Sequence, residues 1–209
     1  MNRICFLALI FVITLCNNSL GQISEGKIIY SLEFPDLNLP AEQKALLPTE
    51  SVTYFKEGKS RSESDGMMGL KTITISTDKE IIMLLDIMGE KSAIRKDLAA
   101  AEKPNKVEIT TDTKRIAGYD CQKAIISANG NDHMEVWFTK SITGGGTWGG
   151  TFDKISGAPM EFSMDNGGIN FKMTAVSVKQ EKVNSSMFTI PVGYKETTEE
   201  ELRNNMYNK

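Results

Sequence analysis

The chain has 209 residues, 40% of them hydrophobic, and a formal net charge of −3. This size predicts one domain with a core large enough to fold without disulfide bonds. The mild acidic balance argues against the basic surface that a nucleic-acid-binding protein needs.

The N-terminus is typical of a secretory signal peptide. A basic first segment precedes the apolar residues 4–15, a run too short to span a bilayer comfortably. Small residues place cleavage after Gly21, so we expect residues 1–21 to be a signal peptide and the protein to be exported, periplasmic or secreted. Lipid attachment at Cys16 is a less favoured alternative, because Leu15 precedes it where a small residue is usual. A retained N-terminal anchor is the third alternative.

We expect no transmembrane segment after the signal peptide. The most apolar later stretch, residues 80–88, carries Asp86 and has the length of a strand.

Alternating apolar and polar residues predict β-strands along most of the remaining chain. In residues 26–34, for example, apolar side chains occupy every second position. About ten strands joined by short polar turns predict one antiparallel, meandering sheet. The expected strands and hairpins lie in residues 26–34, 51–64 with a turn at Glu57-Gly58, 70–87, 92–97, 106–111, 118–138, 159–181 with a turn at Asn166-Gly167, and 187–194.

Helical signals are few and short. Residues 39–48 lie between two prolines, and residues 97–103 are rich in alanine. Thr198 precedes Glu201 by three residues, which predicts a capping box and a short polar helix at the C-terminus.

The hairpin at residues 118–138 contains the only histidine, His133, and the only cysteine after the signal peptide, Cys121. A two-residue turn at Asn129-Gly130 places these side chains about 17 Å apart, and a one-residue slip leaves about 20 Å. A nucleophile and its base must lie within hydrogen-bond reach. We therefore expect Cys121 to be a buried apolar residue and His133 to lie on the surface.

The same turn predicts which side chains share the apolar face of this hairpin. Cys121 would lie opposite Phe138, and Ile125 would lie opposite Met134. Tyr119 and Val136 would join them, with Lys123 as the one polar residue on that face.

No familiar catalytic motif occurs in the sequence. It lacks a Gly-x-Ser-x-Gly elbow, a His-Glu-x-x-His pair, a Cys-x-x-Cys pair and the acidic spacing of a calcium loop. We expect no enzymatic activity, no metal and no cofactor. A dispersed pair of acidic residues, as in glycosidases, remains the enzymatic alternative.

Residues 141–152 combine five glycines with Trp148. Two interpretations remain open: a flexible connection whose tryptophan packs on the sheet, or a mobile flap formed by residues 144–150.

Methionine and aromatic residues are frequent in the expected strands. Methionine is flexible and polarizable and can line a surface that adapts to apolar partners, although it also fills irregular cores. The candidate ligand-binding residues, on the apolar face of the expected sheet, are Tyr119, Met134, Val136, Phe138, Trp148, Phe162, Met164, Phe171 and Met173.

Five motifs resemble a family of secreted bacterial domains that is similar in pattern to the periplasmic lipoprotein carriers LolA and LolB. The motifs are GKIIYSLEF at residues 26–34, TKRIAGYDCQKAII at 113–126, EVWFT at 135–139, GAPMEF at 157–162 and SSMFTIPVGYKE at 185–196. The resemblance covers nearly all of residues 26–196 and implies an open half-barrel with a concave apolar face.

Together, these observations predict an α+β, mostly β protein: a single antiparallel sheet curved into an open half-barrel with a few short helices on one side. Residues 22–197 would form this domain, and residues 198–209 a polar helix or tail. The function expected is non-enzymatic binding of an acyl chain or other apolar ligand in the cell envelope. The alternative is a protein-interaction module with a filled core and no small-molecule ligand.

Overall fold

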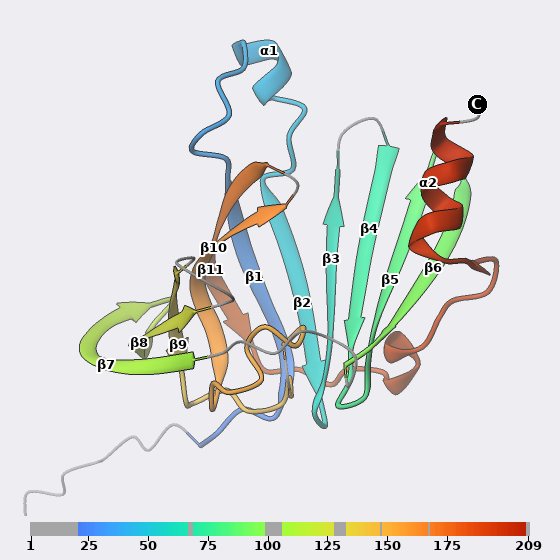
Figure 1. Ribbon diagram of the computed structural model, residues 1–209. Helices are drawn as coiled ribbons and strands as arrows, with labels where there is room; N and C mark the ends of the chain where they lie inside the picture. The colour runs from blue at the N-terminus through green and yellow to red at the C-terminus, as the bar shows by residue number, and fades with distance from the viewer. Residues whose placement is uncertain are drawn as a thin grey trace, which may run out of the picture.

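The computed structural model describes residues 21–66, 69–98, 106–127, 133–146, 148–166 and 168–207. These residues form two short α-helices, one 3₁₀ turn and twelve strands (Figure 1). In chain order the elements are β1 (Glu25–Glu33), α1 (Ala41–Lys44), β2 (Glu50–Lys56), β3 (Lys59–Asp65), β4 (Leu70–Ser76), β5 (Glu80–Ile87), β6 (Glu90–Asp97), β7 (Lys106–Ile116), β8 (Tyr119–Ser127), β9 (His133–Thr139), β10 (Ala158–Asn166), β11 (Ile169–Lys179), η2 (Ser185–Phe188), β12 (Lys195–Glu196) and α2 (Glu199–Tyr207).

All described strands belong to one sheet with the order β12-β6-β5-β4-β3-β2-β1-β11-β10-β9-β8-β7. Two meanders, β1–β6 and β7–β11, join where β1 pairs with β11, so the first strand lies in the middle of the sheet. The pairs are antiparallel except for the short β12, which runs parallel to β6. This is the mostly β, single-sheet architecture that the sequence predicts.

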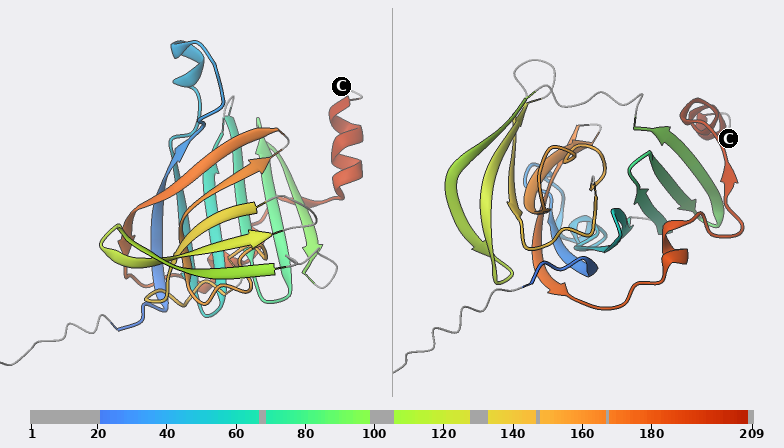
Figure 2. Two further views of the ribbon diagram at one scale, coloured as in Figure 1. Left: turned by 60° about the vertical axis from the view of Figure 1, so that its left-hand side comes forward. Right: turned by 90° about the horizontal axis from the view of Figure 1, so that it is seen from below.

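The sheet bends until its two halves face each other, and it stays open (Figure 2). We call the side enclosed by the bend the interior face and the other side the outer face. The long connection of residues 140–157 lies inside the bend. The helices lie elsewhere: α1 is at the tip of an arm above β1 and β2, and α2 lies beside β6 (Figure 1). Among the described residues, no helix has the length and apolar character needed to cross a membrane.

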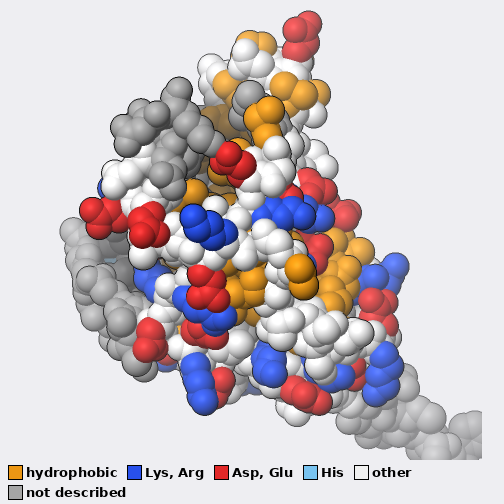
Figure 3. All heavy atoms as spheres, turned by 90° about the vertical axis from the view of Figure 1, so that its right-hand side faces the viewer, with side chains coloured by type: hydrophobic (Ala, Val, Ile, Leu, Met, Phe, Trp, Pro, Cys, Tyr) orange, Lys and Arg blue, Asp and Glu red, His pale blue; other side chains and the backbone are white. Residues whose placement is uncertain are grey.

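A C-terminal segment, residues 180–194, covers the outer face of β3–β6 and contains no α-helix; the sequence predicts a few short helices on one side of the sheet. Five apolar residues of β4–β6 form a buried cluster with side chains of this segment. The strand residues are Ile73, Ile75, Ile82, Leu84 and Ala93, and the buried residues of the segment are Val183 and Phe188. Viewed from the β6 side, charged groups surround the hydrophobic side chains that reach the surface (Figure 3).

Local sequence signals explain two of the chain's turns and ends. The β2–β3 turn has positive φ at Glu57 (49°) and Gly58 (77°), as a two-residue hairpin turn requires. The expected capping box is present: Glu201 N–H donates to Thr198 Oγ1 at 3.1 Å, and Thr198 N–H donates to Glu201 Oε2 at 3.2 Å.

Other local predictions fail or cannot be compared. Asn166 pairs with Ile169, so it belongs to the ladder and is not the first residue of the turn. The helix expected within residues 39–48 shrinks to the four residues of α1. The helix expected at residues 97–103 falls largely outside the described residues, as does the signal peptide except for Gly21.

The predicted register of β8 and β9 is wrong by one residue. Ile126 lies opposite Met134, and Ala124 lies opposite Val136. The last pair of the described ladder joins Ser127 to His133. The residues expected to make that turn, 128–132, lie outside the described part of the chain.

Candidate ligand-binding site

The interior face of β9–β11 is apolar, and the strand register places most of the predicted binding residues there. Phe162 of β10 lies opposite Val136 of β9 and Met173 of β11. We call this surface the apolar wall; it consists of Met134, Val136, Phe138, Phe162, Met164, Phe171 and Met173.

Burial divides the apolar wall into two parts. Val136, Phe138 and Phe162 are buried and form part of a filled core. The other four side chains, Met134, Met164, Phe171 and Met173, are only half-buried. The half-buried part can therefore contact a ligand, whereas the filled part can only support it.

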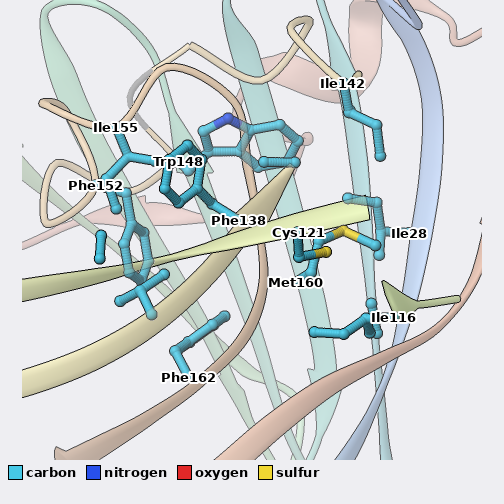
Figure 4. Close-up of a cluster of buried hydrophobic side chains, with 14 of the residues drawn as sticks. Ile28, Ile116, Cys121, Phe138, Ile142, Trp148, Phe152, Ile155, Met160 and Phe162 are labelled. Atoms are coloured by element: carbon cyan, nitrogen blue, oxygen red, sulfur yellow. The ribbon is translucent and has the colours of Figure 1, made fainter. Parts of the chain in front are cut away.

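Residues 140–157, which we call the interior loop, fill one end of the half-barrel. Trp148, Phe152 and Ile155 point from this loop into the core, where Phe138 meets them (Figure 4). The Trp148 ring lies 5.6 Å from that of Phe55 on β2, between centroids. Trp148 is thus a core residue, and the structure favours a packed connection over a flap.

Glycines allow the interior loop to pack this closely. A Cβ at Gly144 would lie 1.9 Å from the Ser24 carbonyl oxygen, and one at Gly145 would overlap the Trp148 ring. Hydrogen bonds also fix the backbone of the loop: for example, the Gly144 carbonyl accepts from Gly58 N–H at 2.9 Å, and Gly149 N–H donates to Ser76 Oγ at 3.1 Å. The loop therefore connects β9 and β10 to β2 and β4 across the interior.

The interior face of β2–β4 carries hydroxyl side chains at eight of ten positions, the exceptions being Phe55 and Leu70. Side chains alternate between faces, and the isoleucines of β4 point outward, so its threonines point inward. The register aligns them in three rows: Ser51, Ser64 and Thr72; Thr53, Ser62 and Thr74; and Phe55, Ser60 and Ser76. We call these eight serines and threonines the hydroxyl array.

Sequence reasoning missed the hydroxyl array. The signal is present as alternation in SRSES and TITIS, but alternation alone does not say which set of side chains faces inward. The alternation leaves open which face Ile73 and Ile75 occupy. In the structure they lie beneath residues 180–194 on the outer face.

Tyr119 and Cys121 lie on β8 and are not part of the apolar wall. Tyr119 is half-buried and packs against the core, and Cys121 is buried beside Met160 (Figure 4). Gln122, not Cys121, lies opposite Phe138. Desolvation raises the pKa of the Cys121 thiol to about 11. This thiol is therefore protonated at neutral pH, as expected for a buried apolar residue.

His133 is exposed at the far end of the same hairpin. Its Nδ1 lies 2.9 Å from Ser127 Oγ. Six ladder positions, about 20 Å at the rise of a strand, separate it from Cys121. The two residues are too far apart to act together.

The outer face of β7–β11 is charged. Lys114 Nζ lies 4.3 Å from the centroid of the Trp137 ring and 2.9 Å from Glu161 Oε1. Lys172 contacts the same carboxylate at 3.4 Å. Burial alone would raise the pKa of Glu161, but the two lysines outweigh it and hold this pKa below its usual value. The apolar wall and this charged surface thus lie on opposite sides of the same strands.

Two acidic residues hold the C-terminal segment on the outer face. Glu25 accepts a hydrogen bond from Val183 N–H at 2.7 Å and pairs with Lys56 at 3.1 Å. These bonds lower the pKa of Glu25 to about 2. Glu63 pairs with Arg61 at 2.6 Å, and Arg61 Nη1 donates to the Met187 carbonyl at 2.8 Å.

Within the described residues, no group of three or more histidine, cysteine, aspartate or glutamate side chains could hold a metal ion. The interior face instead carries the apolar wall on β9–β11, the hydroxyl array on β2–β4 and further apolar side chains on β5, where Met83 and Leu85 lie opposite Thr74 and Thr72.

These features define a class: an open, single-sheet β protein whose interior face is apolar in one part and lined with hydroxyl groups in another. The family model described as "N-glycanase peptide, N-terminal domain" matches residues 58–200, and the chain belongs to that family. The sequence motifs suggested a different family, one of secreted domains similar in pattern to LolA and LolB, and the open, mostly β sheet that this resemblance implies is present.

Solved structures support the fold. PNGF-II has a TM-score of 0.58 at 18% identity; the similarity covers 88% of this chain and 33% of that one. The chain thus spans about a third of PNGF-II. An uncharacterised conserved protein from Thermus thermophilus has a TM-score of 0.50 at 11% identity, covering 84% of this chain and 91% of that one. No curated protein sequence matches the chain.

Proposed function

We propose that the protein is an exported, non-enzymatic binding module of the cell envelope that holds an acyl chain or another apolar ligand on its interior face. The observation that carries this proposal is the half-buried part of the apolar wall, formed by Met134, Met164, Phe171 and Met173. These side chains lie on the enclosed side of the sheet, where a soluble β domain usually completes its core.

The chemistry of the apolar wall supports this ligand class. Three of the four half-buried residues are methionines, whose flexible thioethers adapt to apolar ligands of varied shape. The buried part of the wall and the interior loop provide a rigid base beneath them. A bound chain would cover apolar surface that is now partly open to water, at about 25 cal/mol per Å².

The test is the content of the native protein. Solvent extracts of the purified protein would be examined by mass spectrometry, and displacement of a fluorescent fatty acid would be measured on the delipidated protein. We expect an acyl-bearing molecule in the extract and saturable displacement. An empty extract together with no fatty-acid binding would refute the proposal.

A protein-interaction module is the second candidate. Two observations favour it: the chain corresponds to about a third of PNGF-II, and apolar side chains are exposed outside the interior face. Leu46 in the α1 arm is 63% exposed, and Val192 in the C-terminal segment is fully exposed. Crosslinking in the native envelope tests this candidate, and capture of no partner by a protein that does carry a lipid would exclude it.

A further inference from the structure

The hydroxyl array lies where a sheet normally carries apolar residues. On β4, the isoleucines are buried on the outer face, while Thr72 and Thr74 face the interior and remain half-buried. A wall of this kind is polar without being charged, since none of its ten positions holds an acidic or basic side chain.

Several of these hydroxyls have no partner within the described part of the protein. Others are bonded within the protein. The Ser51 hydroxyl donates to the Glu63 carbonyl, the hydroxyl oxygens of Thr53 and Ser62 lie 2.8 Å apart, and the Ser76 hydroxyl accepts from Gly149 N–H. The hydroxyls of Ser64, Thr72 and Thr74 make no hydrogen bond to any residue in the described ranges. Such groups are available to water or to a ligand.

Ser60 provides a second, independent indication of a ligand. It is only 4% exposed, it lies on the interior face between Phe55 and Ser76, and no described residue hydrogen-bonds its side chain. No fully buried polar atom among the described side chains lacks a partner, so the Ser60 oxygen is not sealed off without a hydrogen-bond partner. A nearly buried hydroxyl on the interior face, with no hydrogen bond to a described side chain or backbone group, is available to water or to a ligand.

The pattern of hydroxyls defines the chemistry of that partner. Serine and threonine both donate and accept hydrogen bonds, which matches ligand groups that do the same. Phosphate or carboxylate would instead call for arginine or lysine. The array repeats at about 5 Å between strands and about 7 Å along them, so several hydroxyls can face one ligand group together.

We propose that the hydroxyl array binds a neutral, polyhydroxylated group, with the apolar wall holding an attached acyl chain. The natural ligand would then be a glycolipid-like amphiphile and not a phospholipid or a free fatty acid. This inference rests on the proposed function, because it assigns the polar end of the same ligand.

The experiment compares three amphiphiles with equal chains, dodecyl maltoside, dodecylphosphocholine and dodecanoate, together with free maltose. Binding would be measured by calorimetry below the concentrations at which each forms micelles. We expect dodecyl maltoside to bind at least tenfold more tightly than the other two. This comparison uses the unaltered protein, so it does not depend on the folding of a variant.

The variants are Thr72→Val/Thr74→Val, which removes two hydroxyls and preserves the β-branched shape, and Thr174→Val, the same change on the outer face of β11. The double variant should bind dodecyl maltoside about tenfold more weakly and dodecanoate as before. Thr174→Val should match the unaltered protein with every probe.

The possible outcomes separate the two proposals. Equal binding of all three amphiphiles overturns the hydroxyl site and leaves the acyl-binding function standing. Binding of maltose alone, lost in the double variant, supports the hydroxyl site and overturns the acyl function. No binding of any probe overturns both.

Discussion

Trp148 packs against Phe55 with ring centroids 5.6 Å apart and planes inclined by 50°. The first residue belongs to the interior loop and the second to β2, so this contact joins two distant parts of the chain across the interior. It converts a glycine-rich connection into the closed end of the half-barrel. The half-buried apolar wall and the hydroxyl array lie on the interior face that this end closes.

Replacing Trp148 with alanine should destabilise the protein by about 3 kcal/mol, because a buried aromatic side chain leaves a cavity. Urea unfolding followed by circular dichroism measures this loss. Trp137→Ala is the matched control: that ring is half-buried on the outer face, so its removal should cost clearly less. Equal losses would mean that the interior loop does not close the core.

Glu25 should make the stability of the protein depend on pH. Its pKa is about 2 in the folded state against an ordinary value of 4.5, because Val183 N–H and Lys56 favour the carboxylate. A depressed folded-state pKa stabilises the protein above pH 4.5, and this stabilisation disappears as the pH falls toward 2. Glu25→Gln should therefore differ from the unaltered protein at neutral pH and converge with it near pH 2.

Thermal melting between about pH 7 and about pH 2 measures this convergence. Glu42→Gln, at an exposed position of α1, serves as the control and should follow the unaltered protein throughout. A constant difference between Glu25→Gln and the unaltered protein at every pH would contradict the role of the Glu25 carboxylate.

Arg61 should be far more important for stability than Arg95, although both lie in one row on the outer face. The Arg61 side chain is 10% exposed and bound to Glu63 and the Met187 carbonyl, whereas that of Arg95 is 43% exposed. Arg61→Ala should cost about 2 kcal/mol, because it leaves the half-buried Glu63 unpaired and takes the charged donor from the Met187 carbonyl. Arg95→Ala should cost less than about 1 kcal/mol, as exposed ion pairs do.

Denaturant unfolding of both variants measures the difference. Glu63→Gln in the Arg61→Ala background should recover part of the lost stability, since it removes the unpaired charge. If the two arginine variants are equally stable, residues 180–194 are not held to the sheet by Arg61.

Cys121 should be chemically inert in the folded protein. Desolvation raises the pKa of its thiol to about 11, so almost no thiolate exists at about pH 8. In a Cys5→Ser/Cys16→Ser background, iodoacetamide should label Cys121 at the ordinary rate of a free thiol only after unfolding in urea. Rapid labelling of the folded protein would show that Cys121 is a reactive thiol and contradict this prediction.

The sequence predicts the strands well because their alternation is local. The β2–β3 hairpin, the β4–β5 hairpin and β6 follow the periodicity closely, and the capping box of α2 needs only Thr198 and Glu201. The apolar wall could also be predicted from the sequence, since Phe162, Met164, Phe171 and Met173 alternate on strands that pair directly.

Long-range arrangements could not be read in this way. The register of β8 and β9 depends on the length of a connection whose composition suggested a shorter turn. The inward direction of the hydroxyl array depends on where residues 180–194 pack, more than a hundred residues after Thr72 and Thr74. Trp148 acquires its role only because glycines allow the interior loop to approach Ser24 and Gly58.

The central claim, that the half-buried apolar wall binds an acyl chain, is tested most directly by two adjacent substitutions on β11. Met173→Gln places an amide on the interior face, and Thr174→Gln places the same amide on the outer face. The affinity of a fluorescent fatty acid would be measured for the unaltered protein and for both variants. We expect Met173→Gln to bind at least tenfold more weakly, since an unpaired amide against an acyl chain costs about 1–3 kcal/mol, and Thr174→Gln to bind normally. Equal affinities in all three proteins, or no binding in any, would contradict the claim.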